Sequence, residues 1–277
     1  MTDVASQTVA ARTDTAQARP RFESAKLVDL GVQVGVIAAI CLVWEFGARA
    51  GAINPFLLPP LSEVLARIWT DALSGVVFVD LGLTLYRALS GFAIAAVIAI
   101  PIGVLMSRVA LVRWFFDPLV SVGFPMPKIA FLPIFILWFD IYDTSKIIMV
   151  TFSCFFPIVA ATYAGTTSQD KWPIWSARSL GAKERHVLWE ISLPMALPQI
   201  LTGLQVALPV GMITTIVTEM LMGGRGVGGA MITAGRFADS VGVFAGIVEI
   251  IFLGFLVVRS LEMLRARLLV WHPETRK

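Results

Sequence analysis

The sequence has few charged residues. Asp, Glu, Lys and Arg make up 15% of the 277 residues, whereas hydrophobic residues make up 57%. A soluble domain keeps about a quarter of its residues charged. The composition therefore excludes an ordinary soluble globular domain and indicates a membrane protein that crosses the bilayer several times.

Cysteine and histidine are almost absent. Cys41 and Cys154 both fall in apolar runs, where they read as small buried hydrophobes, so no disulfide framework is indicated. His186 and His272 are far apart and have no metal-ligand neighbours. The acids are scattered, and no G-x-x-x-x-G-K-[ST] motif occurs. We therefore expect no catalytic residue, no cofactor site and no metal site in this chain.

Long apolar runs are abundant. A helix needs about 20 apolar residues to cross about 30 Å of hydrocarbon. By this test the spans cover residues 30–48, 81–107, a broken stretch within 110–140, 145–165, 199–222 and 241–263. The third is interrupted by Pro118, Pro125, Pro127 and Pro133. The predicted fold is all-α, with six transmembrane helices.

Polar stretches divide the chain. Residues 1–29 read as a disordered cytoplasmic tail, and residues 30–80 hold the first transmembrane helix, an uncleaved anchor, and an interfacial helix within PFLLPPLSEVLARIWTDAL. Residues 81–265 form a core of five transmembrane helices, and 266–277 a cytoplasmic C-terminal tail.

Lysine and arginine predict the orientation. With a cytoplasmic N-terminus, fifteen of the 22 Lys and Arg residues fall on the inside and five on the outside. Arg87 and Lys128 lie within spans. Since cytoplasmic loops carry the excess of positive charge, both termini and the loop at 166–198 are predicted to be cytoplasmic.

That loop contains SLGAKERHVLWEISLP, which is too polar to span. Its apolar residues recur at helical spacing, Gly181 interrupts the middle, and Pro194 ends the stretch. Pro194 and Pro198 then restart the chain into the fifth span, because proline is tolerated near the start of a helix. The pattern predicts two short helices around a glycine elbow. Their apolar face either docks another protein or rests on lipid headgroups.

The order Ala177, Gly181, nine residues and then Ile-Ser-Leu-Pro at 191–194 resembles the cytoplasmic EAA loop of ABC importer permeases. That pattern reads E-A-A, three residues, G, nine residues, I-x-L-P. Trp175 stands at the position of the glutamate, and Ser176 replaces the first alanine. Residues 55–270 resemble the sulfonate, taurine and nitrate branch, as in PFLLPPLSEV, TLYRALSGFAIA, PIFILWFDIYDTSKI, FFPIVAATYAG and LPMALPQILTGLQVAL.

The resemblance implies a type I importer in the bacterial inner membrane. A homodimer of this chain forms the conduit, two copies of a separate ATPase carry ATP and Mg, and a soluble binding protein delivers a small anion. No nucleic-acid partner is implied. The coupling helix to the ATPase would comprise Ala177, Leu180, Gly181, Ala182, Lys183, Glu184, Arg185, Val187, Leu188, Ile191, Leu193 and Pro194.

Two alternatives stay open. Related permeases carry neutral or cationic vitamin precursors, so the cargo is not fixed by the resemblance. A self-sufficient secondary transporter would show an internal inverted repeat, and none is visible in the sequence. An intramembrane enzyme would need convergent catalytic groups within the spans, which the scattered acids do not supply.

Ionisable groups within spans need a partner or a purpose. Arg87 and Glu219 lie at similar depths, which is consistent with an ion pair. The alternative is that each side chain extends separately to the membrane interface. Thr214, Thr215, Thr218 and Glu219 share one side of the fifth span. That side is either a helix contact or, as the resemblance favours, the conduit wall.

The stretch GRGVGG at 224–229 fits G-x-G-x-x-G, but it follows a membrane span and not a strand. A dinucleotide site is therefore disfavoured, and a flexible turn on the outer side is predicted. Arg225 and Arg236 there either attract an anionic substrate or are simply solvated.

Overall fold

The computed structural model describes residues 22–51 and 53–271, and within these ranges every regular element is helical. The predicted all-α fold is therefore confirmed. The tails predicted at the two ends lie largely outside the described residues. The chain divides into two units after Glu63, which are described separately.

Unit 1 contains α1 (Phe22–Arg49) and the first residues of α2 (Leu61–Leu73). The segment from Gly31 to Arg49 is long and apolar enough to cross a membrane. Glu45, near the end of α1, accepts hydrogen bonds from Arg49 Nε at 2.5 Å and from the main-chain N–H of Ser62 at 3.0 Å. The predicted anchor thus ends at a polar turn that leads into the predicted interfacial helix.

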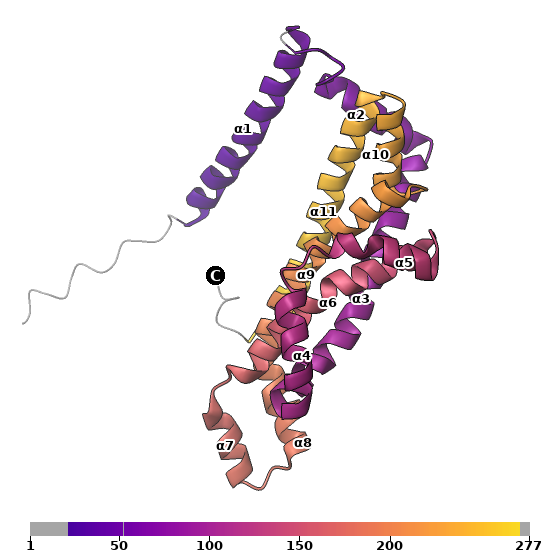
Figure 1. The fold of residues 1–277 in the computed structure, drawn as a ribbon. Coiled ribbons are helices and arrows are strands. Elements are labelled where there is room, and N and C mark those ends of the chain that lie inside the picture. Colours follow the sequence, from indigo (N-terminus) through magenta and orange to yellow (C-terminus); the bar gives the residue numbers. More distant parts are fainter. Residues whose placement is uncertain (1–21, 52, 272–277) are drawn as a thin grey trace, which may run out of the picture. The chain divides into compact units, whose positions relative to one another are not determined.

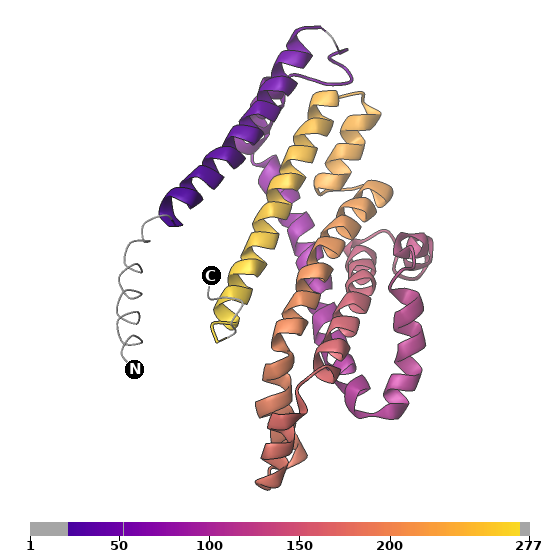
Figure 2. The ribbon, with the colours of Figure 1, turned by 90° about the vertical axis from the view of Figure 1, so that its left-hand side faces the viewer.

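Unit 2 is built from long helices with shorter ones at both ends (Figure 1, Figure 2). Its elements after α2 are α3 (Val76–Arg108), α4 (Ala110–Gly123), the 3₁₀ turn η1 (Lys128–Phe131), α5 (Leu132–Phe139), α6 (Asp143–Thr167), α7 (Lys171–Ser179), α8 (Glu184–His186), the π-helical segment η2 (Val187–Ser192), α9 (Leu193–Met222), α10 (Val227–Arg236) and α11 (Ser240–Leu268).

Small residues bring the central helices of unit 2 together. Helix α6 packs along both α3 and α9. A Cβ added at Gly91 or Gly103 of α3 would lie 2.6 Å from the Cβ of Val150 or Thr162 of α6, respectively. Close backbone approach of this kind drives helix association in lipid, where the hydrophobic effect contributes little between helices.

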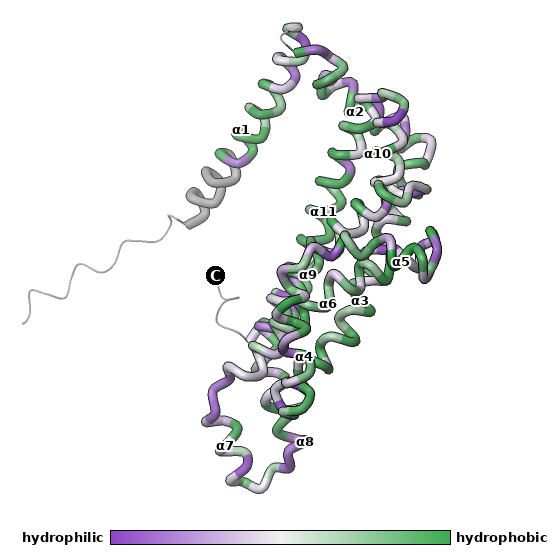
Figure 3. The backbone as a smooth tube through the Cα atoms, in the orientation of Figure 1, coloured by the Kyte–Doolittle hydropathy of each residue, from purple (hydrophilic) through white to green (hydrophobic). Residues whose placement is uncertain are grey.

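The ends of unit 2 differ in character from its middle. Figure 3 shows apolar residues along α3, α6, α9 and α11 and hydrophilic residues gathered at the segment of α7 and α8. Both ribbon views place α7 and α8 at one end of unit 2 and α10 at the other. Large apolar side chains such as Val97 and Phe255 point outward and are exposed. An apolar exterior along helices of this length is typical of membrane spans.

The third predicted span is not a straight helix. Among the described residues, five helices are long and apolar enough to cross a membrane, and a sixth span exists if the bent pair Ala110–Gly123 and Lys128–Phe139 is one. The two arms of that pair meet at 102°. Pro125 and Pro127 lie in the break, where proline removes main-chain donors and so interrupts the helix.

Pro194 lies at the start of the fifth span, as predicted, but it does not separate that span from the surface helix. A continuous helical run extends over Glu184–Met222, and Pro194 lies in the first turn of its α9 segment. Proline is tolerated in a first turn, where its missing N–H costs little. The wider π turn of η2 precedes it and joins the surface segment to the membrane helix without a break.

Candidate functional sites

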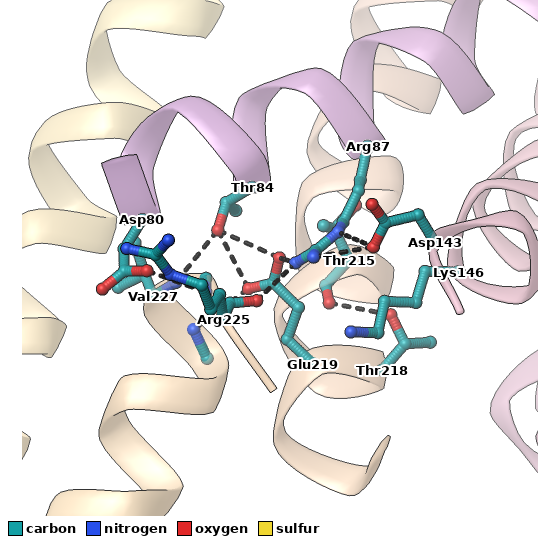
Figure 4. Close-up of polar contacts among 12 residues, drawn as sticks. Asp80, Thr84, Arg87, Asp143, Lys146, Thr215, Thr218, Glu219, Arg225 and Val227 are labelled. Carbon is teal, nitrogen blue, oxygen red and sulfur yellow. Dashed lines mark hydrogen bonds and ion pairs between the residues drawn. The ribbon is translucent and has the colours of Figure 1, made fainter. Parts of the chain in front are cut away.

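The first candidate site is a buried polar cluster at the α10 end of unit 2 (Figure 4). Arg87 of α3 and Glu219 of α9 are 3% and 0% exposed. Arg87 Nη1 lies 2.5 Å from Glu219 Oε1, so the expected ion pair is present. On its other side, Arg87 Nη2 lies 2.7 Å from Oδ1 of Asp143 in α6. Three membrane helices therefore meet at one guanidinium.

The Glu219 carboxylate has further donors. Thr84 Oγ1 donates to Oε2 at 2.9 Å, and the main-chain N–H of Gly228 donates to the same oxygen at 3.1 Å. Removing a carboxylate from water is costly unless it is paired and hydrogen-bonded. Here both conditions hold, so these contacts offset the cost of burying the Glu219 carboxylate.

Side chains of this polar cluster also hold the main chain of residues 223–228. Arg87 Nη1 donates to the carbonyl of Arg225 at 2.7 Å, and the N–H groups of Gly226 and Val227 donate to Asp80 Oδ1 at 3.1 Å and Thr84 Oγ1 at 3.0 Å. We call this arrangement the loop clamp. It is made by Asp80, Thr84, Arg87, Lys146 and Glu219.

The loop clamp satisfies the start of α10. The first N–H groups of a helix have no partner within the helix, and an acid nearby is favoured by the helix dipole. Gly226, Val227 and Gly228 supply these N–H groups, and the clamp accepts them from α3 and α9. Helix α10 is thereby fixed to the central helices through its N-terminus.

The glycines of GRGVGG are required by packing. Gly226 has a φ of 120°, and a Cβ there would lie 2.5 Å from Glu219 Cδ. A Cβ on Gly228 would overlap the main-chain oxygen of Ile216. The predicted flexible turn is therefore wrong, because this loop is pinned and tightly packed. The available signal in the sequence was the presence of both a glycine-rich loop and polar residues within the second span, which together indicate a close contact.

The threonines of α9 do not line an open path in this structure. Thr214, Thr215 and Thr218 are all buried within the chain. Their hydroxyls donate to main-chain oxygens of the same helix, as Thr214 does to Val210 at 2.8 Å and Thr215 to Gly211 at 2.9 Å. With Glu219 also enclosed, we correct the placement of these four side chains from conduit wall to helix contact.

The second candidate site is the surface elbow, residues 171–192. Asp170 caps the N-terminus of helix α7, and its side chain accepts from the N–H of Trp172 at 3.1 Å. The chain then reverses at Gly181, where φ is 83° and a Cβ would meet nothing within 4 Å. Glycine is favoured there by its backbone conformation and not by lack of space.

An ion pair closes the elbow. Arg178 Nε and Nη2 donate to the two carboxylate oxygens of Glu184 at 2.7 and 3.0 Å. The hydrogen bond to Glu184 raises the pKa of Arg178 above its ordinary value. A two-pronged arginine–carboxylate contact fixes orientation as well as distance, so the two arms of the elbow are held in one geometry.

The residues of the predicted coupling helix divide between surface and interior. Leu180 is 86% exposed, whereas Val187 is fully buried and packs within the chain. Val187 is thus removed from the expected docking face. Ala177, Ala182, Leu188, Ile191 and Leu193 are half-buried, and Gly181, Lys183, Glu184, Arg185 and Pro194 are exposed.

Two aromatic residues add to the exposed face of the elbow. Trp172 and Trp175 are 73% and 50% exposed, and their ring centroids lie 5.6 Å apart at 76°. Residues three apart on a helix are neighbours, so the spacing in the sequence was the available signal. Trp175 was identified only as a residue that departs from the EAA pattern, and Trp172 was not predicted to belong to this face.

The base of the elbow is tied to the central helices. Arg108, at the end of α3, donates from Nη2 to Ser192 Oγ at 2.6 Å. Gln169 Nε2 donates to the carbonyl of Ser192 at 2.5 Å. Ser192 is buried and directly precedes α9, so a displacement of the elbow reaches α3 and α9 through short polar contacts.

Known membrane transport proteins resemble this chain in sequence. Residues 95–270 match the family described as binding-protein-dependent transport system inner membrane component. The taurine transport system permease protein TauC of Escherichia coli is 35% identical over 88% of this chain and 90% of its own length. The putative aliphatic sulfonates transport permease protein SsuC of Bacillus subtilis is 30% identical over 84% of this chain and 85% of its own.

Two further relatives are informative. The formylaminopyrimidine transport permease protein ThiX of Halalkalibacterium halodurans is 32% identical over 85% of this chain and 93% of its own. An inward-facing structure of the MetNI methionine ABC transporter superposes with a TM-score of 0.56 over 69% of this chain and 98% of the matched chain, at 17% identity. The last likeness concerns the fold. The chain belongs to the family of binding-protein-dependent transport system inner membrane components, and it is a permease component of an ABC importer.

Proposed function

We propose that this chain is the membrane subunit of an ATP-driven importer for small organic sulfonates such as taurine. Two copies would form the conduit, two separate ATPase subunits would bind ATP and Mg, and a soluble protein would deliver the substrate. The similarity to taurine and sulfonate permeases over most of the chain supports this substrate class.

The observation that carries the proposal is the surface elbow. It presents Trp172, Trp175 and Leu180 to the outside while an ion pair and Ser192 hold its base. A rigid, exposed apolar face that is too short to span suits a groove on a soluble partner. The ATPase would occupy it from the cytoplasmic side, and the distribution of Lys and Arg supports both termini on that same side.

The continuous helix provides the mechanism. Because Glu184–Met222 is one helical run, a push on the elbow tilts α9 without passing through a flexible joint. Movement of the two ATPases during hydrolysis would then open the conduit to alternate sides of the membrane. The chain itself would break no bond.

A second candidate cargo is a neutral or cationic vitamin precursor. It is favoured by the identity with a formylaminopyrimidine permease, which approaches that with the taurine permease. The fold and the elbow would serve both cargoes equally, so transport itself must decide.

The test is uptake by the complete importer. The permease would be reconstituted in liposomes with its cognate ATPase and binding protein. We expect ATP-dependent uptake of labelled taurine or ethanesulfonate and none of a formylaminopyrimidine. Uptake of the pyrimidine alone would replace the cargo, and uptake by the permease without ATP would replace the importer with a secondary transporter.

A further inference from the structure

A cavity of about 390 Å³ lies beside the loop clamp at the α10 end of unit 2. Its wall is formed by the loop at 224–226, α10 and the first turns of α3, with contributions from α2 and the residue before α11. Four charged side chains line it: Arg67, Asp80, Arg225 and Asp239. The wall therefore carries two positive and two negative charges.

One of the two charge pairs is already formed. Arg67 Nη1 lies 3.1 Å from Asp239 Oδ2, and Arg67 Nε lies 2.8 Å from Asp71 Oδ2. Asp239 also accepts the N–H of Gly242 at the start of α11. These charges hold the rim of the cavity together, and because they are already paired they attract a ligand only weakly.

The other two charges do not contact each other. Arg225 is exposed, and within the described part of the chain its guanidinium has no carboxylate within ion-pair distance. Asp80 uses Oδ1 to accept the N–H of Gly226. Figure 4 shows the Arg225 side chain extending from the loop toward Asp80. A cation and an anion thus face one cavity without neutralising each other.

The loop clamp fixes this geometry. The carbonyl of Arg225 accepts from Arg87, and the next N–H donates to Asp80, so the backbone is held on both sides of the Arg225 side chain. Asp80 is itself mostly buried on α3. A binding site whose charged groups stand on immobilised backbone loses less entropy when a ligand binds.

We propose that this cavity binds a small zwitterion, with its anionic group at Arg225 and its ammonium group at Asp80. The inference rests on the proposed function and narrows its substrate class from sulfonates in general to aminosulfonates such as taurine. The planar guanidinium of Arg225 offers paired donors to sulfonate oxygens, and Asp80 offers an acceptor to the ammonium.

Mixed charge also explains what the cavity rejects. A simple anion would meet Arg225 favourably but would lie beside the carboxylate of Asp80. A simple cation would meet Asp80 favourably but would lie beside Arg225. Like-charge contacts of this kind reduce the affinity for the wrong ligand, so selectivity comes from repulsion as well as attraction.

The test is direct binding to the full-length permease in lipid nanodiscs, without the other subunits. Labelled taurine is the probe, and ethanesulfonate and ethylamine, each lacking one of its charged groups, are the competitors. The variants are Arg225→Gln, which retains the main-chain contact with Arg87, and Asp80→Asn, which retains Oδ1 as acceptor for Gly226. Arg236→Gln is the matched control, because Arg236 is exposed on α10 but does not line the cavity. Size-exclusion profiles and melting temperatures verify that each variant is folded.

We expect saturable taurine binding that weakens at least about tenfold in each cavity variant and is unchanged in Arg236→Gln. Both competitors should bind at least about tenfold more weakly than taurine. Ethanesulfonate binding as tightly as taurine would overturn the zwitterion assignment, as would normal taurine binding by Arg225→Gln or no saturable binding at all.

The uptake assay of the complete importer keeps the two proposals distinguishable. Uptake of sulfonates with no effect of the cavity variants refutes the cavity alone, whereas uptake of no sulfonate refutes the proposed function.

Discussion

Arg87 Nη1 and Glu219 Oε1 lie 2.5 Å apart, with both side chains almost fully enclosed by the chain. The two residues come from α3 and α9, which are far apart in the sequence, with the elements α4 to η2 between them. The same pair also binds the loop before α10 through the Arg225 carbonyl and the Gly228 N–H. One ion pair therefore connects two spans to helix α10.

Replacing Arg87 with methionine should destabilise the permease strongly. The change leaves the Glu219 carboxylate buried with Thr84 and Gly228 as donors but without a positive partner. Breaking a buried pair from one side costs about 3–5 kcal/mol. We expect this loss in the free energy of unfolding, measured by denaturant titration in mixed micelles.

The double variant Arg87→Met, Glu219→Met provides the control for that prediction. Removing both charges should cost less than the sum of the two single changes, because neither member of the pair is then left buried without the other. Arg113→Gln, an exposed arginine on α4, should have little effect. Strictly additive losses would show that the two charges do not stabilise each other.

Replacing Gly228 with alanine should destabilise the protein, whereas Gly254→Ala should not. A Cβ on Gly228 would overlap the carbonyl oxygen of Ile216 and lie 2.9 Å from Glu219 Cβ. Overpacking of this kind costs about 1–3 kcal/mol. A Cβ on Gly254 of α11 would meet nothing within 4 Å, so alanine there should add about 0.5–1 kcal/mol of helix stability. Melting temperatures that move in the same direction for both variants would contradict this account.

Apolar length and charge placement were sufficient to predict much of the fold. A span is a local property, since about 20 apolar residues identify it, and each straight span appears as a helix with ends displaced by a few residues. The Arg87–Glu219 pair was also predictable, because buried charges in a membrane require partners. Depth along two helices was enough to match them.

The errors concern features that depend on neighbouring elements. Pro194 was expected to separate the surface helix from the fifth span because a proline breaks an isolated helix, but a π turn accommodates it here. Thr214, Thr215 and Thr218 share a side of α9, and a sequence does not reveal whether that side meets another helix or a path. The clamped loop was not predicted because its partners on α3 lie more than 130 residues away in the chain.

Cys154 should resist thiol reagents until the protein unfolds. Its side chain is fully buried, and Sγ donates to the carbonyl of Ala207 in α9 at 3.3 Å. In a Cys41→Ser background, a maleimide dye should label the folded protein slowly and the denatured protein at once. Labelling at the rate of a free thiol in detergent, with a normal melting temperature, would show that α6 and α9 do not pack as described.

Gly181 separates the role of the elbow from the stability of the membrane core. A valine at this position has room for its side chain, but the φ of 83° is unfavourable for a β-branched residue. The strain should distort the exposed elbow while leaving the packing of α3, α6 and α9 intact. We therefore expect Gly181→Val to keep its melting temperature within a few degrees and to lose association with the ATPase, measured by co-purification.

Gly181→Asn is the matched variant, because asparagine tolerates positive φ better than other residues with a side chain. It adds polar bulk at the same position and should retain ATPase association and ATP-dependent uptake. Loss of both ATPase association and uptake in Gly181→Asn would mean that the ATPase contacts the bare backbone at Gly181. Normal uptake by Gly181→Val would exclude the elbow as the element that couples ATP hydrolysis to transport.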